Sequence, residues 1–100
     1  MTEYTPTLDE IAAATSKRTG VPMSLIKGNS RKSPIVSARH VVLALAREYG
    51  YNHNEIWGFI RRDATSYYNS VHRVKITPTL SKISDQVSND LWTFDPREAA

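Results

Sequence analysis

The stretch from Arg61 to Val74 limits the possible folds more than any other part of the chain. It begins with a basic turn and continues as a helix whose apolar residues, Tyr68 and Val71 among them, fall on one face. The other face carries side chains that can hydrogen-bond: Thr65, Ser66, Asn69 and Arg73. A helix that packs on a core and directs such side chains toward phosphates and base edges is typical of the second helix of a helix-turn-helix.

The residues around this helix predict the rest of the motif. Asn52-His53-Asn54-Glu55 is a capping pattern that starts a short apolar helix. Asp63 is a suitable N-cap for the second helix, which we expect to run to about Lys75 before Thr77-Pro78 ends it. A short helix, a tight turn and a longer helix over about residues 52–76 follow the helix-turn-helix order.

Two further helices are predicted in the first half of the chain. The capping box Thr7-Leu8-Asp9-Glu10 starts a helix over residues 8–19, and a turn after it places Leu25 and Ile26 in the core. The second helix runs from Ser37, its expected N-cap, to Tyr49. The polar, turn-rich segment 27–34 is predicted to be a basic loop, and Arg39 and Arg47 to project from one side of the helix after it.

The last part of the chain predicts one more helix, because Leu80, Ile83, Val87 and Leu91 have helical spacing. With 100 residues, 40% of them hydrophobic, the chain suffices for one compact core and not for two ordinary domains. We therefore expect a single all-α domain over residues 1–100, with five to six helices. Its core and motif occupy residues 8–76, and the terminal helix and a frayed tail occupy residues 77–100.

Composition excludes several classes of protein. The absence of cysteine removes disulfides and thiolate metal sites, and the three histidines are too scattered to form a ligand cluster. No signal-peptide pattern or long apolar run is present, so we expect a cytoplasmic protein that does not interact with a membrane. The sequence has no cluster of acidic residues that could bind a catalytic metal. We therefore expect no cofactor and no enzyme activity.

Positive charge is concentrated in two segments. The net charge is only +3, but seven basic residues and no acidic one lie between Lys17 and Arg47. Residues 61–75 add Arg61, Arg62, Arg73 and Lys75 against a single acidic residue, Asp63. If the fold brings these segments together, they form one positive face suited to a polyanion; otherwise they are ordinary solvated surface.

Residues 8–76 resemble the C-terminal DNA-binding domain of DnaA, the bacterial replication initiator. Three landmarks carry the resemblance, in the family's order: the basic loop from Arg31 into Val36-Ser37-Ala38-Arg39-His40-Val41-Val42-Leu43-Ala44-Leu45-Ala46-Arg47-Glu48, then Glu55-Ile56, then Arg62-Asp63-Ala64-Thr65-Ser66. The last is similar to the family signature Arg-Asp-His-Thr-Thr-Val. The resemblance implies an all-α helix-turn-helix domain that binds double-stranded DNA.

The departures from the family pattern concern specificity and nucleotide binding. Ala64 replaces the signature histidine, Tyr67 replaces the valine, and the turn between Glu55 and Asp63 is one residue shorter than usual. A different or more weakly read DNA box is therefore expected. The chain has no Gly-x-x-x-x-Gly-Lys-Ser/Thr loop, so it is not a complete initiator and we expect no nucleotide ligand.

The resemblance also implies roles for individual residues. Arg31, with Lys32 beside it, would enter the minor groove; Arg39 and His40 would contact the duplex, and Arg47 would hold a phosphate. Arg61 and Arg62 would lie on the DNA backbone, while the start of the second motif helix would meet base edges in the major groove. The complete set of expected DNA contacts is Arg31, Lys32, Arg39, His40, Arg47, Arg61, Arg62, Asp63, Ala64, Thr65, Ser66, Asn69 and Arg73.

Simpler structural roles compete with several of these assignments. Asp63 can serve as a helix cap without contacting a base, and the arginines before it can form a solvated turn. Tyr68 is best interpreted as a core residue. His40, His53 and His72 have surface or capping roles by default, because no nucleophile or carboxylate stands at a recognisable spacing. Trp57 and Trp92 are interpreted as core or core-edge anchors.

Two functions remain from different classes. The first is sequence-specific binding of double-stranded DNA, in replication initiation or its regulation, or as a small phage or mobile-element regulator. A replication or transcription protein is a second candidate partner, and the Met1-Thr2-Glu3-Tyr4 start favours a stand-alone chain over a fragment. The second function is a helical protein-interaction module that keeps the scaffold without binding DNA.

Overall fold

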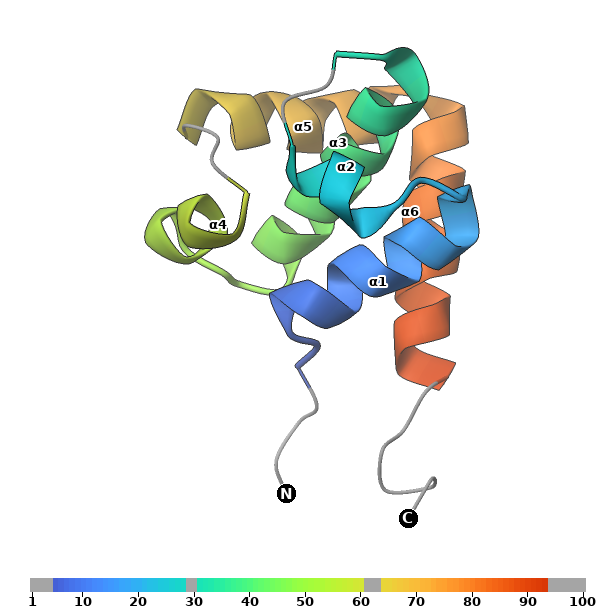
Figure 1. Cartoon of the computed structure of the whole chain (residues 1–100), viewed down its shortest axis with the longest axis horizontal. Coiled ribbons are helices and arrows are strands. Elements are labelled where there is room, and N and C mark those ends of the chain that lie inside the picture. The colour runs from blue at the N-terminus through green and yellow to red at the C-terminus, as the bar shows by residue number, and fades with distance from the viewer. Residues whose placement is uncertain (1–4, 29–30, 61–63, 94–100) are drawn as a thin grey trace.

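Six helices make up the computed structural model, which describes residues 5–28, 31–60 and 64–93 (Figure 1). At His53, residues 64–68 and residues 92–93 it describes the backbone alone. The described residues contain no strand, so the predicted all-α class is confirmed. The helices are α1 (Leu8–Thr19), α2 (Met23–Lys27), α3 (Ser33–Glu48), α4 (His53–Phe59), α5 (Ala64–Ile76) and α6 (Pro78–Thr93).

Local capping signals set the starts of α1 and α4. The Glu10 amide donates to the Thr7 hydroxyl, and the Glu10 carboxylate accepts from the Thr7 amide. Asn52 and Glu55 make the same reciprocal pair. Each box satisfies two backbone amides that a helix start leaves without partners, so both predicted starts are confirmed. Helix α1 ends at Gly20, whose φ of 77° is the left-handed conformation that glycine adopts most easily.

Helix α3 begins five residues earlier than the sequence analysis predicts. Ser33, and not a residue after Ser37, is its first residue, and Pro34 lies in its first turn. Proline fits there because the first amides of a helix lack intrahelical acceptors and the ring presets a helical φ. The earlier start also buries Ile35 against the core. The segment between α2 and α3 is therefore shorter than expected, and we call residues 28–32 the basic loop.

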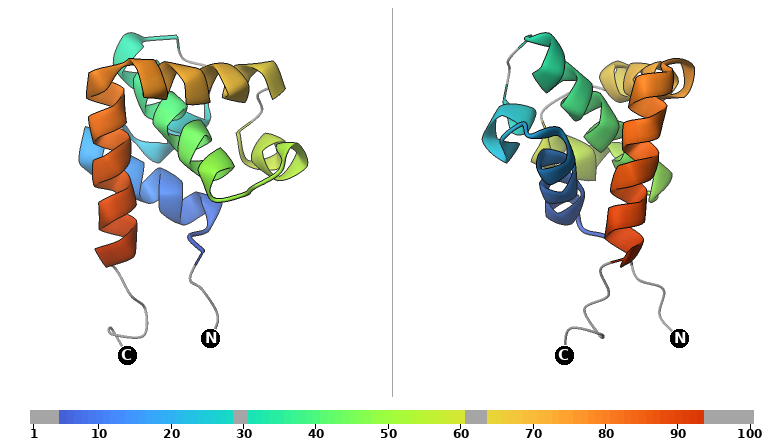
Figure 2. Two further views of the ribbon diagram at one scale, coloured as in Figure 1. Left: turned by 180° about the vertical axis from the view of Figure 1, so that it is seen from behind. Right: turned by 90° about the vertical axis from the view of Figure 1, so that its right-hand side faces the viewer.

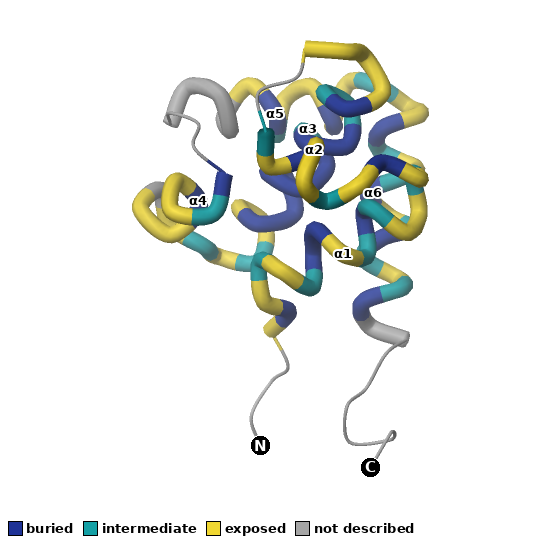
Figure 3. Tube along the Cα trace, viewed as in Figure 1, coloured by how far each residue is buried: buried dark blue, intermediate teal, exposed yellow. Residues whose placement is uncertain are grey.

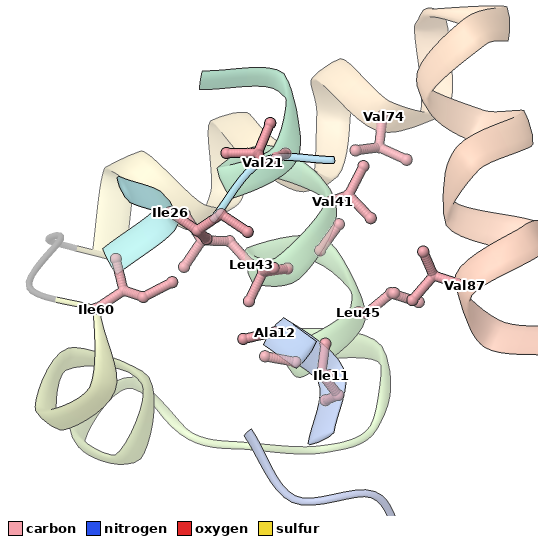
Figure 4. Packing of buried hydrophobic residues seen from close by; sticks show 14 of the residues in the cluster. Ile11, Ala12, Val21, Ile26, Val41, Leu43, Leu45, Ile60, Val74 and Val87 are labelled. Atoms are coloured by element: carbon pink, nitrogen blue, oxygen red, sulfur yellow. The ribbon is translucent and has the colours of Figure 1, made fainter. Parts of the chain in front are cut away.

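Helix α3 is the centre of the molecule. Every residue from Val41 to Ala46 is buried, and Figure 3 shows the middle of this helix as a continuous buried stretch. A helix that is apolar on all sides must be surrounded, and α1, α2, α5 and α6 all pack against it. Figure 4 shows Val41, Leu43 and Leu45 of α3 among side chains from these neighbours. The prediction that this is the central core helix is confirmed.

Helix α6 packs back on the core, as its helical spacing predicts. Leu80, Val87 and Leu91 are buried, and α6 lies against α1, α3 and α5. On its outer side the Arg18 guanidinium of α1 donates to both oxygens of the Asp90 carboxylate, with Nη2–Oδ1 at 2.6 Å, Nη2–Oδ2 at 2.8 Å and Nε–Oδ2 at 3.1 Å. The bidentate pair joins the first helix to the last.

The predicted core position of Leu25 is wrong, and Trp57, predicted at the core or its edge, is largely exposed. The Leu25 side chain is 42% exposed, and only its neighbour Ile26 enters the core, because the short helix α2 directs one side inward. Trp57 is 45% exposed, since Ile56 and Ile60 are the α4 residues that anchor this helix. The predictions for the side chains of Tyr68 and Trp92, and for the tail at 96–100, lie outside what the structure describes. Within the described helices, none is long and apolar enough to cross a membrane.

Candidate DNA-binding surface

The basic loop and α5 lie at the same end of the molecule. Figure 1 shows α5 along the top edge, with residues 31–32 and the start of α3 at the same edge. The views in Figure 2 show the same arrangement, and α5 packs against α3 where the two helices cross. The fold therefore brings together the two segments in which the sequence concentrates positive charge.

The side chains at this end suit a nucleic-acid backbone. Arg31 and Lys32 are exposed on the basic loop, and Asn69 and Arg73 are exposed on α5. Ala64, Thr65 and Ser66 form the start of α5, where their backbone is helical. The predicted contacts Arg61, Arg62 and Asp63 lie outside the described residues.

Arg39 was predicted to project from the surface, but its side chain is buried. Its side chain is 6% exposed, its Nε donates to the Ile26 carbonyl at 2.7 Å, and its Nη2 donates to the Leu25 carbonyl at 3.1 Å. Arg47 is exposed in the last turn of the same helix, so only one of the two arginines projects into solvent. The prediction fails because angular spacing on a helix does not show which neighbour covers a given turn.

His40 connects α3 to α5. Its Nδ1 lies 2.7 Å from the hydroxyl oxygen of Ser70, which is buried in the middle of α5. The imidazole is half-buried, and this burial lowers the pKa of His40 below its ordinary value. The nearby positive charges of Arg73 and Arg39 lower the pKa further. His40 therefore favours its neutral form, and the default surface role predicted for it gives way to a contact between helices.

A pH dependence of folding follows from this shift. The unfolded chain titrates His40 near 6.5, whereas the folded domain titrates it at lower pH. We expect the free energy of unfolding to fall as pH is lowered through 6.5, because the unfolded state then binds a proton that the folded state does not. Urea denaturation between pH 7.5 and 5.5 should show a shallower pH dependence for His40→Gln than for wild type. His72→Gln, at an exposed site on α5, is the matched control, and an equal change in both variants would contradict this account.

Arg47 lies far from the basic loop. It stands fourteen residues after Ser33, which corresponds to about 21 Å along the helix axis. Acidic residues gather at that end of the molecule, on the first turn of α1, the last turn of α3 and the first turn of α4: Asp9, Glu10, Glu48 and Glu55. The domain is thus electrically polarised, with the basic loop and α5 opposite this acidic end (Figure 1).

The arrangement of helices and charges is that of a helix-turn-helix with a basic loop beside its second helix. The family described as bacterial dnaA protein helix-turn-helix matches residues 8–74, which is two-thirds of the chain. The chain belongs to this DnaA family. No curated protein and no solved structure matches the sequence. The resemblance on which the sequence analysis relied is therefore confirmed.

Membership in the DnaA family defines the class of the domain. It is a DNA-binding helix-turn-helix of the DnaA type, a family whose C-terminal domain is not catalytic. In this DnaA-type domain α4 and α5 form the motif, and α6 begins after the last matched residue. Among the described residues, no group of histidine and acidic side chains could hold a metal ion.

Ser70 is a residue that the sequence analysis did not single out. It lies four residues before Val74, on the buried side of α5, and its exposed fraction is 1%. A serine on the apolar side of an amphipathic helix needs a hydrogen-bond partner, and here His40 provides it. The position of Ser70 on the apolar side of α5 was the sequence signal that it has a hydrogen-bond partner. The identity of that partner depended on how α3 and α5 cross.

Proposed function

We propose that this DnaA-type domain binds double-stranded DNA sequence-specifically, with the start of α5 in the major groove and the basic loop in the adjacent minor groove. The observation that carries the proposal is that two segments about thirty residues apart in sequence present exposed polar and basic side chains at one end of the molecule. A duplex lying there would stay away from the acidic residues at the other end.

Each group of residues has its own role in this proposal. Arg31 and Lys32 bind in the minor groove, whose negative potential favours arginine. Arg61, Arg62, Asn69 and Arg73 bind the DNA backbone, and Asp63, Ala64, Thr65 and Ser66 face base edges. Ala64 can pack on a thymine methyl but cannot donate a hydrogen bond, so the preferred box differs from that of a histidine-containing relative at this position.

Two expected contacts do not belong to the central surface. Arg47 lies toward the acidic end of α3 and would reach only a flanking phosphate. Arg39 is buried, so it affects DNA binding only by holding α2 in place. The function served is replication initiation or its regulation, or control of a phage or mobile element, with no catalysis and no nucleotide.

A protein-interaction module is the second candidate function. The observation in its favour is Trp57, which is 45% exposed on α4 and has the size and shape of an interface anchor. The two functions differ in salt response. DNA binding that neutralises about six phosphates gives a slope of log affinity against log salt near −5, and a protein interface gives a much shallower one.

The deciding experiment is a fluorescence-anisotropy titration of the whole chain against an initiator-type box duplex and a shuffled duplex of equal composition. We expect tighter binding to the box at near-physiological salt and a steep salt dependence. Equal affinity for both duplexes would overturn sequence specificity of the initiator type. Absence of binding to either would overturn DNA binding and favour the interaction module.

A further inference from the structure

Arg39 closes the end of α2. The carbonyls of Leu25 and Ile26 belong to the last turn of a five-residue helix, where backbone carbonyls lack intrahelical partners. The Arg39 guanidinium donates to both carbonyls, and one of them also accepts from the Gly28 amide. A buried charge is tolerated only when its donors are satisfied, and these carbonyls contribute to that requirement.

This contact holds α2, the helix directly before the basic loop, against α3. The loop starts directly after α2 and ends where α3 begins, so Arg39 fixes one end to α3 and the chain itself fixes the other. Lys27, just before the loop, also lies over the Phe59 ring of α4, with Nζ 4.5 Å from the ring centroid. Arg31 and Lys32 directly precede α3, and the helix before the loop is bonded to the same α3 through Arg39.

His40, the next residue of α3, restrains α5. Its 2.7 Å contact with Ser70 joins the centre of α5 to the same turn of α3. Adjacent residues of one helix therefore hold the two elements that the proposed function places in two different grooves. Helix α3 is buried and rigid at this point, because Val41 and Val42 follow immediately in the core.

We infer that Arg39 and His40 are positioning residues that set the distance between the basic loop and α5, and that this distance makes the domain selective for the spacing of its minor-groove and major-groove sites. The inference rests on the proposed function. It differs from the role that family resemblance implies, in which Arg39 itself contacts the duplex, because the Nε and Nη2 donors of the buried Arg39 are directed at α2 carbonyls.

The conservative substitution Arg39→Lys separates these two roles. Lysine keeps the positive charge, so it would largely preserve a phosphate contact. It has one ammonium group in place of a planar fork and cannot reproduce two donations from Nε and Nη2. Loss of function in Arg39→Lys therefore reports the loss of positioning and not the loss of charge.

The test is an anisotropy titration with the box duplex and with a set of duplexes that carry one extra base pair at each position of the box in turn. We expect wild type to bind the intact box at least about tenfold more tightly than the most damaging insertion, since one bidentate base contact is lost. Arg39→Lys should reduce this preference to about threefold or less. Arg18→Lys, at an arginine of α1 that pairs with Asp90 outside the proposed surface, is the control and should keep the wild-type preference.

Ser70→Ala is the second variant, in case Arg39→Lys does not fold. It replaces a buried hydroxyl by a methyl group, and far-UV circular dichroism verifies that each variant is helical. It should also reduce the spacing preference, because α5 loses its bond to His40. A wild-type spacing preference in the folded variants overturns the inference and leaves DNA binding intact. If wild type does not distinguish the box from the shuffled duplex, the proposed function fails and the inference fails with it.

Discussion

Val41→Asp should abolish folding of this domain. Val41 is completely buried in the central helix α3, among side chains from the surrounding helices. An aspartate there either leaves a charge in an apolar interior or takes up a proton at a cost, and it also loses the packing of the valine. The total is of the order of several kcal/mol, comparable with the roughly 5–15 kcal/mol by which small domains are stable. Far-UV circular dichroism at pH 7 should show little helix, and a cooperative urea transition should be absent.

Ile76→Asp is the matched control for this prediction. It introduces the same charge in place of another aliphatic residue of a helix, but Ile76 is 60% exposed. Its free energy of unfolding should lie within about 0.5 kcal/mol of wild type. Val71→Asp, on the apolar face of α5, should have an intermediate effect because Val71 is only partly buried. A folded Val41→Asp protein would contradict the central position of α3.

The double substitution Arg31→Ala/Arg73→Ala should lower affinity for the box duplex about 100-fold at near-physiological salt. Each arginine is exposed, one on the basic loop and one on α5. Two charge-assisted contacts of roughly 1.4 kcal/mol each account for the loss. The slope of log affinity against log salt should become shallower by about 2, because about two fewer counterions are released on binding. Anisotropy titrations at four salt concentrations measure both quantities.

A variant with the same change in net charge shows whether position matters. Lys17→Ala/Lys82→Ala removes two exposed cations from α1 and α6, which do not belong to the proposed surface. We expect its affinity to stay within about threefold of wild type, since only long-range attraction is reduced. Equal losses in the two double variants would mean that binding follows net charge, and the proposed orientation on DNA would be wrong.

Much of the fold can be predicted from the sequence because the relevant signals are local. Helix α1 starts and ends as predicted, through the Thr7 and Glu10 box and through Gly20. The start of α3 was misplaced because Ser37 resembles an N-cap as closely as Pro34 resembles a first-turn proline. Local propensity does not choose between these starts, and the burial of Ile35 favours the earlier one.

The candidate DNA-binding surface is only partly predictable, because the signals in the sequence are local and the surface is formed by distant segments. Charge along the chain identifies the loop at Arg31 and the helix that contains Arg73 as basic segments. It does not show that Arg39, equally basic, is buried, because its hydrogen bonds go to residues 13 and 14 positions away. Nor does it show that Trp57 is exposed, since one turn of α4 offers several apolar residues for a single anchoring side.

The sequence by itself determined the presence of the main helices, the caps of α1 and α4 and the DnaA family to which the chain belongs, because these depend on residues within about four positions of each other or on motif order. Only the tertiary structure decided which basic residues meet at one end, that Arg39 faces α2, and that His40 meets Ser70 thirty residues later. Those outcomes depend on how α3 crosses its neighbours, and that crossing is set by the packing of the whole core.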